Sequence, residues 1–258
     1  MNDHRQEIAD NLEQYLIGLD DTFAFKCRNC GKCCKNREDI LLNSRDIFNL
    51  AIALSLNNEQ VINKFCEIYI GEASRFPILR LKPIGTNSAC PFFKENKCSV
   101  HSLKPASCAL FPLGRVVISD AAKENNILDK DLCSPNEVQY ILQNSSCGSA
   151  KRKQTVRGWL EMFNVPINDS FFLLWTQNFI TLSTIMREIE EKPYASTKAL
   201  DVLRNGILMS LYVDYDTQKD FIEQYESNMS KIHRLLAKLQ SMSSKLMTNH
   251  ESYLLIEY

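Results

Sequence analysis

The sequence predicts a mainly α-helical fold in which an irregular cysteine-rich region with a few short strands packs against C-terminal helices. Two observations carry this prediction. Beyond about residue 153, apolar residues recur at the spacing of a buried helix face. Before residue 150, short apolar runs alternate with cysteines, prolines and polar turns, which is typical of irregular backbone.

The same change in character predicts two parts of the chain. Residues 1–160 are expected to hold an N-terminal helix and a cysteine-cluster metal-binding domain, and residues 161–258 a helical region packed on it. A chain of 258 residues with 45% hydrophobic content can bury a large core, and it is near the size at which one core gives way to two.

Two amphipathic helices are expected before residue 57. Apolar spacing predicts the first over residues 8–17. Asn43, followed three positions later by Asp46, is close to a capping box and predicts the start of the second helix.

A third helix is expected from Asn57 or Asn58 to Gly71, because glycine favours a helix end. Cys66 lies on the apolar face of this helix, beside Phe65. We therefore interpret Cys66 as a small core residue rather than a metal ligand.

Two short strands are expected next. The run 77–85 alternates apolar and basic residues, and the run 114–120 reads GRVVISD. Residues 121–150 are polar and predict an irregular segment. Three long helices complete the chain, and their apolar stripes over residues 171–189, 200–211 and 221–239 are interpreted as helix core.

Charge and composition exclude several classes of partner. The net charge of −1 provides no basic field to recruit nucleic acid, and no aromatic platform accompanies the basic residues near the first cysteines. The charged N-terminus is unlike a signal peptide, and no apolar run is long enough to cross a membrane. A cytoplasmic protein is expected, so its ten cysteines predict metal or redox sites rather than structural disulfides.

Eight of the cysteines follow a plan. They are Cys27, Cys30, Cys33 and Cys34 in an overlapping Cys-x2-Cys pattern, then Cys90, Cys98 and Cys108, then Cys147. A Cys-x2-Cys turn lets two sulfurs converge on one metal, and Gly31 supplies the tight backbone that the turn needs. Basic residues surround the first run and match the negative charge of thiolate ligands: Lys26, Arg28, Lys32, Lys35 and Arg37.

The adjacent pair Cys33 and Cys34 is expected to fit one tetrahedral site poorly, because neighbouring side chains generally point in different directions. The pattern therefore indicates two sites or one polynuclear cluster, and all-thiolate ligation leaves both zinc and iron–sulfur open. His101 is interpreted as a partly buried residue near the site, with a ligand or proton-carrying role as the alternative. Cys133 is either a spare ligand or an ordinary thiol.

Four segments resemble the YkgJ-like cysteine-cluster family of zinc- or iron-chelating proteins, whose signature is Cys-x2-Cys-x2-Cys-Cys. They are Phe25–Cys34, the Leu42–Ile47 helix start, Cys90–Phe93 with Cys98–Cys108, and Phe111–Leu113 leading to Cys147–Gly148. The resemblance covers about residues 23–160 and implies that the eight cysteines of the plan are the metal ligands. Where the family often has Tyr and Arg-Pro, this chain has His101 and Lys104-Pro105.

These observations predict a metal-binding protein that holds an iron–sulfur cluster or Zn2+ through eight cysteines and transfers electrons to or from a redox partner. One alternative is a structural zinc module that presents the helical region to an unknown protein partner. Another is a protein lysine N-methylase, since flagellin lysine methylases carry a similar cluster, although the sequence has no G-x-G-x-x-G loop. No catalytic residue is assigned. Eight cysteines leave no open metal position, which favours electron transfer or a structural role over Lewis-acid catalysis.

Overall fold

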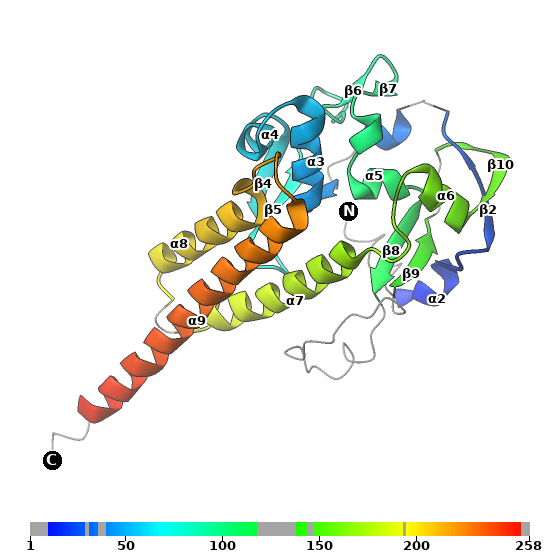
Figure 1. The fold of residues 1–258 in the computed structure, drawn as a ribbon. Helices are drawn as coiled ribbons and strands as arrows, with labels where there is room; N and C mark the ends of the chain where they lie inside the picture. Colours follow the sequence, from blue (N-terminus) through cyan, green and yellow to red (C-terminus); the bar gives the residue numbers. More distant parts are fainter. Residues whose placement is uncertain are drawn as a thin grey trace.

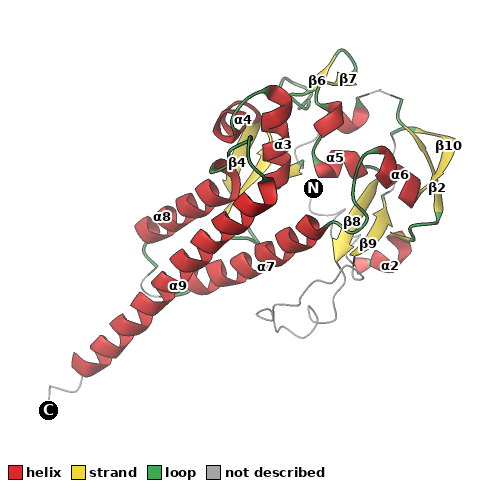
Figure 2. Ribbon diagram, viewed as in Figure 1, coloured by secondary structure: helices red, strands yellow, loops and turns green. Residues whose placement is uncertain are grey.

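The computed structural model describes residues 10–28, 31–35, 40–117, 138–143, 147–192 and 195–253, with side chains through residue 238. Its elements are mainly helices with short strands, as the sequence predicts (Figures 1 and 2). The helices are α2 (Leu12–Tyr15), α3 (Ser44–Leu54), α4 (Asn58–Phe65), α5 (Ala106–Leu110), α6 (Val156–Met162), α7 (Ser170–Glu190), α8 (Thr197–Leu208) and α9 (Phe221–Tyr253).

Within the described residues, the strands form four small antiparallel sheets, ordered β1-β9-β8, β10-β2, β3-β5-β4 and β6-β7. Their bounds are β1 (Leu16–Ile17), β2 (Thr22–Lys26), β3 (Leu41–Leu42), β4 (Cys66–Ile70), β5 (Pro77–Leu81), β6 (Phe93–Lys94), β7 (Lys97–Cys98), β8 (Leu113–Val117), β9 (Val138–Leu142) and β10 (Ser149–Thr155).

The larger hydrophobic core joins the C-terminal helices to the first half of the chain. Helices α7, α8 and α9 lie along one another in an elongated lobe, with α3, α4, β4 and β5 at one end (Figure 1). The side chains of Ile47, Leu79, Met186, Ile207 and Tyr225 are fully buried together there. The division of the chain at residue 160 stays a prediction.

A second, smaller core lies between the β1-β9-β8 sheet, the β10-β2 pair and α6. It contains the buried side chains of Phe23, Leu113, Tyr140, Trp159 and Leu160. Both cores border the cysteine segments, so these segments rest on packed apolar side chains on two sides.

Two predicted helix starts are confirmed in atomic detail. At α3, the Asn43 side chain accepts the Asp46 backbone N–H at 2.9 Å, and Asp46 accepts the Asn43 N–H at 3.1 Å. At α4, Asn57 and Gln60 form the same reciprocal capping box. These bonds satisfy backbone donors that no helical carbonyl can reach.

Two helix predictions are too long. Residues Leu16–Ile17, expected to end the first helix, instead form β1 and pair with β9. The third helix ends at Phe65 rather than Gly71, because the run Cys-Glu-Ile-Tyr-Ile forms β4 against β5. Its two isoleucines and its tyrosine suit a pleated surface better than a helix, and pairing with β5 decides the outcome.

The strand predictions are confirmed at β5 and β8, but the irregular segment is wrong in part. Residues 138–142 and 149–155 form β9 and β10, whereas residues 118–137 and 144–146 lie outside the described part of the chain. The three C-terminal helices are confirmed as α7, α8 and α9. Within the described chain, no helix combines the length and the apolar character that crossing a membrane requires.

Candidate metal centre

One cavity gathers the predicted metal ligands. It has a volume of about 140 Å³ and is lined by seven of the eight cysteines of the plan. These seven are Cys27, Cys33, Cys34, Cys90, Cys98, Cys108 and Cys147. Cys30, the eighth, and the ambiguous Cys133 lie outside the described residues. Segments separated by more than a hundred positions in sequence therefore meet at one place.

Backbone pairing explains how the distant segments meet. In the β10-β2 pair, Ser149 lies opposite Lys26, which carries Cys147 to the end of β2, where Cys27 follows. The Cys90 backbone N–H donates to the carbonyl oxygen of Cys34 at 2.7 Å. Strand pairing and one direct hydrogen bond thus hold three cysteine segments together before any metal is considered.

Two glycines permit close packing beside the cysteines. Gly31 and Gly148 each follow a cysteine in sequence, and their φ angles are +69° and +82°, where only glycine is unstrained. A Cβ on Gly31 would overlap the ring of Phe93, and a Cβ on Gly148 would overlap the ring of Phe25. The tight turn predicted at Gly31 is confirmed, and the structure adds an equivalent requirement at Gly148.

The adjacent pair Cys33 and Cys34 corrects an expectation from the sequence. Both residues lie on a single 3-10 turn, Lys32–Cys34, and their Sγ atoms are 3.8 Å apart. A tetrahedral site with Zn–S bonds of about 2.3 Å has S–S edges of about 3.8 Å. The argument that adjacent cysteines point apart is therefore wrong here, because the tight turn brings the two sulfurs together.

The other described cysteines of the plan line the same cavity, but their sulfur atoms do not form a closed metal site. Among the described side chains, no three from His, Cys, Asp and Glu converge closely enough to hold a metal ion. The eight described cysteines are thiols rather than disulfides, so their sulfurs can move toward a ligand. The donor type fits zinc or iron, and metal binding by such thiols is coupled to local folding.

Lys104 supplies positive charge to the cavity. Its side chain is half-buried, and its ammonium lies 3.8 Å from the centre of the Phe163 ring. Burial lowers the pKa of Lys104, while the thiolate charges of cysteines in the cavity, Cys108 and Cys98 first among them, act to raise that pKa. Lys104 is therefore a cation that the structure places toward the thiolates.

His101 lines the same cavity but is exposed. Desolvation lowers its pKa, and the neighbouring Lys104 charge lowers that pKa further, so its neutral form is favoured. Its ring lies 6.0 Å from that of Phe163. The prediction that His101 is partly buried is therefore wrong, because the residue is exposed. The prediction that it lies near the cysteines is confirmed.

Burial changes the pKa of two cysteines, Cys90 in the cavity and Cys66 in the larger core. Burial raises the pKa of Cys90, and the backbone N–H groups of Phe92 and Phe93 act in the opposite direction by stabilising its thiolate. Cys66 lies in the larger core and does not line the cavity, and burial raises the pKa of its thiol to about 12. The interpretation of Cys66 as an apolar core residue is confirmed, although it begins β4 rather than lying on a helix.

An aromatic wall is the feature that the sequence did not reveal. Six Phe and Trp side chains line the cavity: Phe25, Phe92, Phe93, Phe111, Trp159 and Phe163. The last two come from α6 and the residue that follows it, and the Trp159 indole N–H donates to the Leu110 carbonyl at 3.0 Å, which joins α6 to α5. Their i, i+4 spacing indicates only a helix face, so the sequence carries no signal for this role.

Comparison with known proteins identifies the cysteine region. Residues 26–148 match the family model CxxCxxCC, described as "Putative zinc- or iron-chelating domain". This segment contains all seven cysteines that line the cavity, with Cys27 near one end and Cys147 near the other. No curated protein and no solved structure matches the chain.

Proposed function

Because residues 26–148 belong to the CxxCxxCC family of zinc- or iron-chelating domains, we propose that the cysteine cavity holds an iron–sulfur cluster and that the protein transfers electrons. The ligands proposed are Cys27, Cys30, Cys33, Cys34, Cys90, Cys98, Cys108 and Cys147. Metal binding itself follows from the family, whereas the kind of metal centre and its role are the proposal.

The observation that carries the proposal is that seven cysteines share one cavity. Two separate structural zinc sites would divide the thiols into two groups of four, each closed around its own ion. The cavity instead measures about 140 Å³. A single water-sized sphere needs only about 10–15 Å³, so the space accommodates a group of several atoms.

The chain's own residues suit a redox centre. The cysteines would ligate the metal, and the Lys104 ammonium offsets their negative charge. The aromatic wall, which includes Phe25, Trp159 and Phe163, limits the access of water. When bound, an iron–sulfur cluster would supply a centre that accepts and releases single electrons. Cys27 is exposed, which places one ligand at the surface, where a partner can approach.

The redox partner is proposed to be an acidic protein. Lys26, Arg28 and Lys32 are exposed and flank Cys27 or precede Cys33 in sequence. Positive charge at the edge of the site would steer an acidic partner toward the exposed ligand and would make the association rate fall with salt.

The first experiment is purification without oxygen, followed by measurement of iron, zinc, acid-labile sulfide and the absorption spectrum. We expect iron and sulfide in comparable amounts, with charge-transfer absorption that dithionite bleaches and air restores. Cys98→Ala should lose iron and sulfide together, whereas Cys66→Ala, which removes a core thiol outside the cavity, should retain both. Zinc near two per chain without sulfide would overturn the proposal.

A structural zinc module is the second candidate. The 3.8 Å separation of the Cys33 and Cys34 sulfurs favours it, because this distance is the edge of a tetrahedral zinc–thiolate site. That module would bind zinc without redox activity and would unfold on chelation. Methylation of protein lysines stays a prediction from the resemblance.

A further inference from the structure

Helix α5 carries Cys108 but is too short to fix its own position. It spans only five residues, Ala106–Leu110, and isolated helices shorter than about 12–15 residues are marginally stable in water. Its N-cap residue, Pro105, makes no side-chain hydrogen bond to the first turn. Contacts with other elements therefore decide where this helix lies and where it places Cys108.

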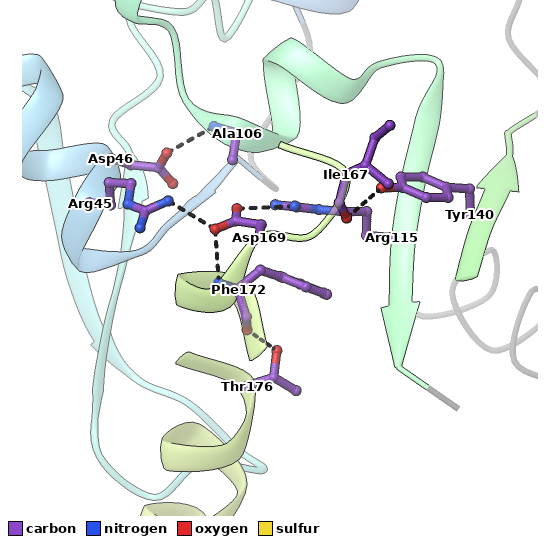
Figure 3. A network of polar contacts seen from close by, with 9 residues as sticks. All are labelled: Arg45, Asp46, Ala106, Arg115, Tyr140, Ile167, Asp169, Phe172 and Thr176. Carbon is purple, nitrogen blue, oxygen red and sulfur yellow. Dashed lines mark hydrogen bonds and ion pairs between the residues drawn. The ribbon is translucent and has the colours of Figure 1, made fainter. Parts of the chain in front are cut away.

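A buried carboxylate holds the first turn of α5. Asp46, on α3, accepts the backbone N–H of Ala106 on its Oδ1 atom at 2.8 Å, across 60 positions of sequence (Figure 3). This N–H is one of the donors at a helix start that no helical carbonyl can reach. Burial raises the pKa of Asp46 to about 6, so at pH 7.5 the group is a carboxylate and the bond is charge-assisted. Asp46 therefore supplies the cap that Pro105 cannot.

The second oxygen of Asp46 belongs to α3 itself. Its Oδ2 atom accepts the backbone N–H of Asn43 at 3.1 Å in the capping box. One carboxylate thus ties the starts of α3 and α5 together. Asp46 and Ala106 line a second cavity, of about 530 Å³, and neither lines the cysteine cavity. Asp46 therefore acts on Cys108 through the α5 backbone rather than by contact.

The other end of α5 is held by α6. The Trp159 indole N–H donates to the Leu110 carbonyl at 3.0 Å, and the Trp159 side chain is buried. Cys108 lies midway between the two anchored ends, two residues after Ala106 and two before Leu110. Its side chain lines the cysteine cavity. A loss of either anchor is therefore expected to displace this thiol.

Two ion pairs of Asp169 fix the elements on either side of α5. Asp169 is the N-cap residue of α7. Arg45, which precedes Asp46 on α3, reaches its Oδ1 atom at 3.0 Å, and Arg115, on β8, reaches its Oδ2 atom at 3.1 Å (Figure 3). The Arg115 and Asp169 side chains are only 5% and 8% exposed, so solvent screens this pair little. The start of α3 and the strand that follows α5 are thus held at one helix end, which keeps Asp46 within reach of α5.

We propose that Asp46 is a positioning residue of the metal centre, which holds the start of α5 so that Cys108 faces the cysteine cavity before metal binds. A buried carboxylate is costly unless it is hydrogen-bonded, so the two bonds of Asp46 favour the placement of α5 that satisfies both oxygens. The inference rests on the proposed function in taking Cys108 as a ligand. The placement of α5 itself does not depend on the metal.

The first test uses the metal-free protein. Iodoacetamide alkylates its thiols, and mass spectrometry follows the rate at each cysteine. We expect Asp46→Ala to speed the reaction of Cys108 by roughly tenfold, because α5 then opens locally. The rate at Cys66, which is buried in the larger core, should stay as it is in the unsubstituted protein.

Two matched substitutions accompany Asp46→Ala. Ala106→Pro breaks the same bond from the α5 side, because proline has no backbone N–H yet suits the first position of a helix, so it should also speed alkylation of Cys108. Asn43→Ala weakens the start of α3 but leaves the bond between Asp46 and Ala106, so it should not. Unchanged Cys108 rates in Asp46→Ala and Ala106→Pro, or equal acceleration at Cys66 in both, would overturn the proposal. Equal acceleration of Cys108 by Asn43→Ala would overturn it as well.

The second test loads the protein with Co2+, whose charge-transfer absorption from sulfur grows with the number of thiolate ligands. Asp46→Ala should lower this absorption toward that of Cys108→Ala and weaken Co2+ retention by about 10–100-fold. The double variant should retain Co2+ no more weakly than Cys108→Ala, because both substitutions act on one ligand, and a further loss would overturn the proposal. Full absorption in Cys108→Ala would overturn the ligand assignment of the proposed function, whereas alkylation would still decide whether Asp46 places α5.

Discussion

The Sγ atoms of Cys33 and Cys34 lie 3.8 Å apart on one tight turn, although adjacent residues usually direct their side chains apart. The turn begins after Gly31, whose positive φ angle redirects the backbone. Two neighbouring thiols can therefore act on the same metal centre, which leads to the first prediction.

Cys34→Ser should remove most of the bound metal, because it takes one sulfur from a pair that lies 3.8 Å apart in the cavity. The control is Cys66→Ala, which removes a buried thiol from the larger core. We expect Cys66→Ala to lower the free energy of unfolding by about 1 kcal/mol and to leave the metal content unchanged. Metal analysis of both variants checks this, and equal metal loss in the two would contradict the assignment.

Lys104→Gln should weaken metal retention by about 10–100-fold, the range typical of residues that support metal ligands. The reason is that the Lys104 ammonium offsets thiolate charge, with Cys108 its principal partner. Competition with a chelator measures the effect. Lys97→Gln is the control, because Lys97 is exposed and does not line the cavity. Identical retention in the two variants would argue against an electrostatic role.

Gly148→Ala should destabilise the protein by more than Gly85→Ala. Both glycines have positive φ angles, of +82° and +68°, so alanine costs each of them roughly 1–2 kcal/mol of backbone strain. Only at Gly148 would the new Cβ also overlap the Phe25 ring, whereas nothing lies within 4 Å at Gly85. Denaturant unfolding gives the loss of unfolding free energy for each variant, and the difference between the two losses is the contribution of the overlap with Phe25. Equal losses would exclude that contribution.

Asp46→Asn should remove a pH dependence of stability. Burial raises the folded-state pKa of Asp46 from 3.8 to about 6, against the opposing effects of two backbone N–H groups and of Arg115 and Arg45. The folded state therefore binds the proton more tightly, and this contribution is complete below pH 3.8 and is lost as the pH rises through about 6.

Between pH 5 and pH 8, the stability of the unsubstituted protein relative to Asp46→Asn should fall by about 1.4 kcal/mol. Denaturant unfolding at the two pH values measures this double difference, from which other titrating groups cancel. A difference that stays constant, or that grows with pH, would show that Asp46 is not a carboxyl of raised pKa.

Local signals predicted several elements correctly. The capping residues Asn43 and Asn57 set the starts of α3 and α4, because the reciprocal hydrogen bonds involve residues only three positions apart. The long apolar stripes of α7, α8 and α9 were equally clear. Strand β4 was missed because its pairing with β5, rather than its own composition, decides its conformation.

The cysteine spacing by itself predicted a metal-binding region and the thiols to consider, because Cys-x2-Cys turns are a local property of the chain. Tertiary structure alone decided that seven of them share one cavity, that Lys104 faces them, and that Trp159 and Phe163 enclose them. It alone brought Arg115 and Asp169 together beside a second cavity. The physical reason is that these contacts join residues distant in sequence, through packing and strand pairing that no local spacing encodes.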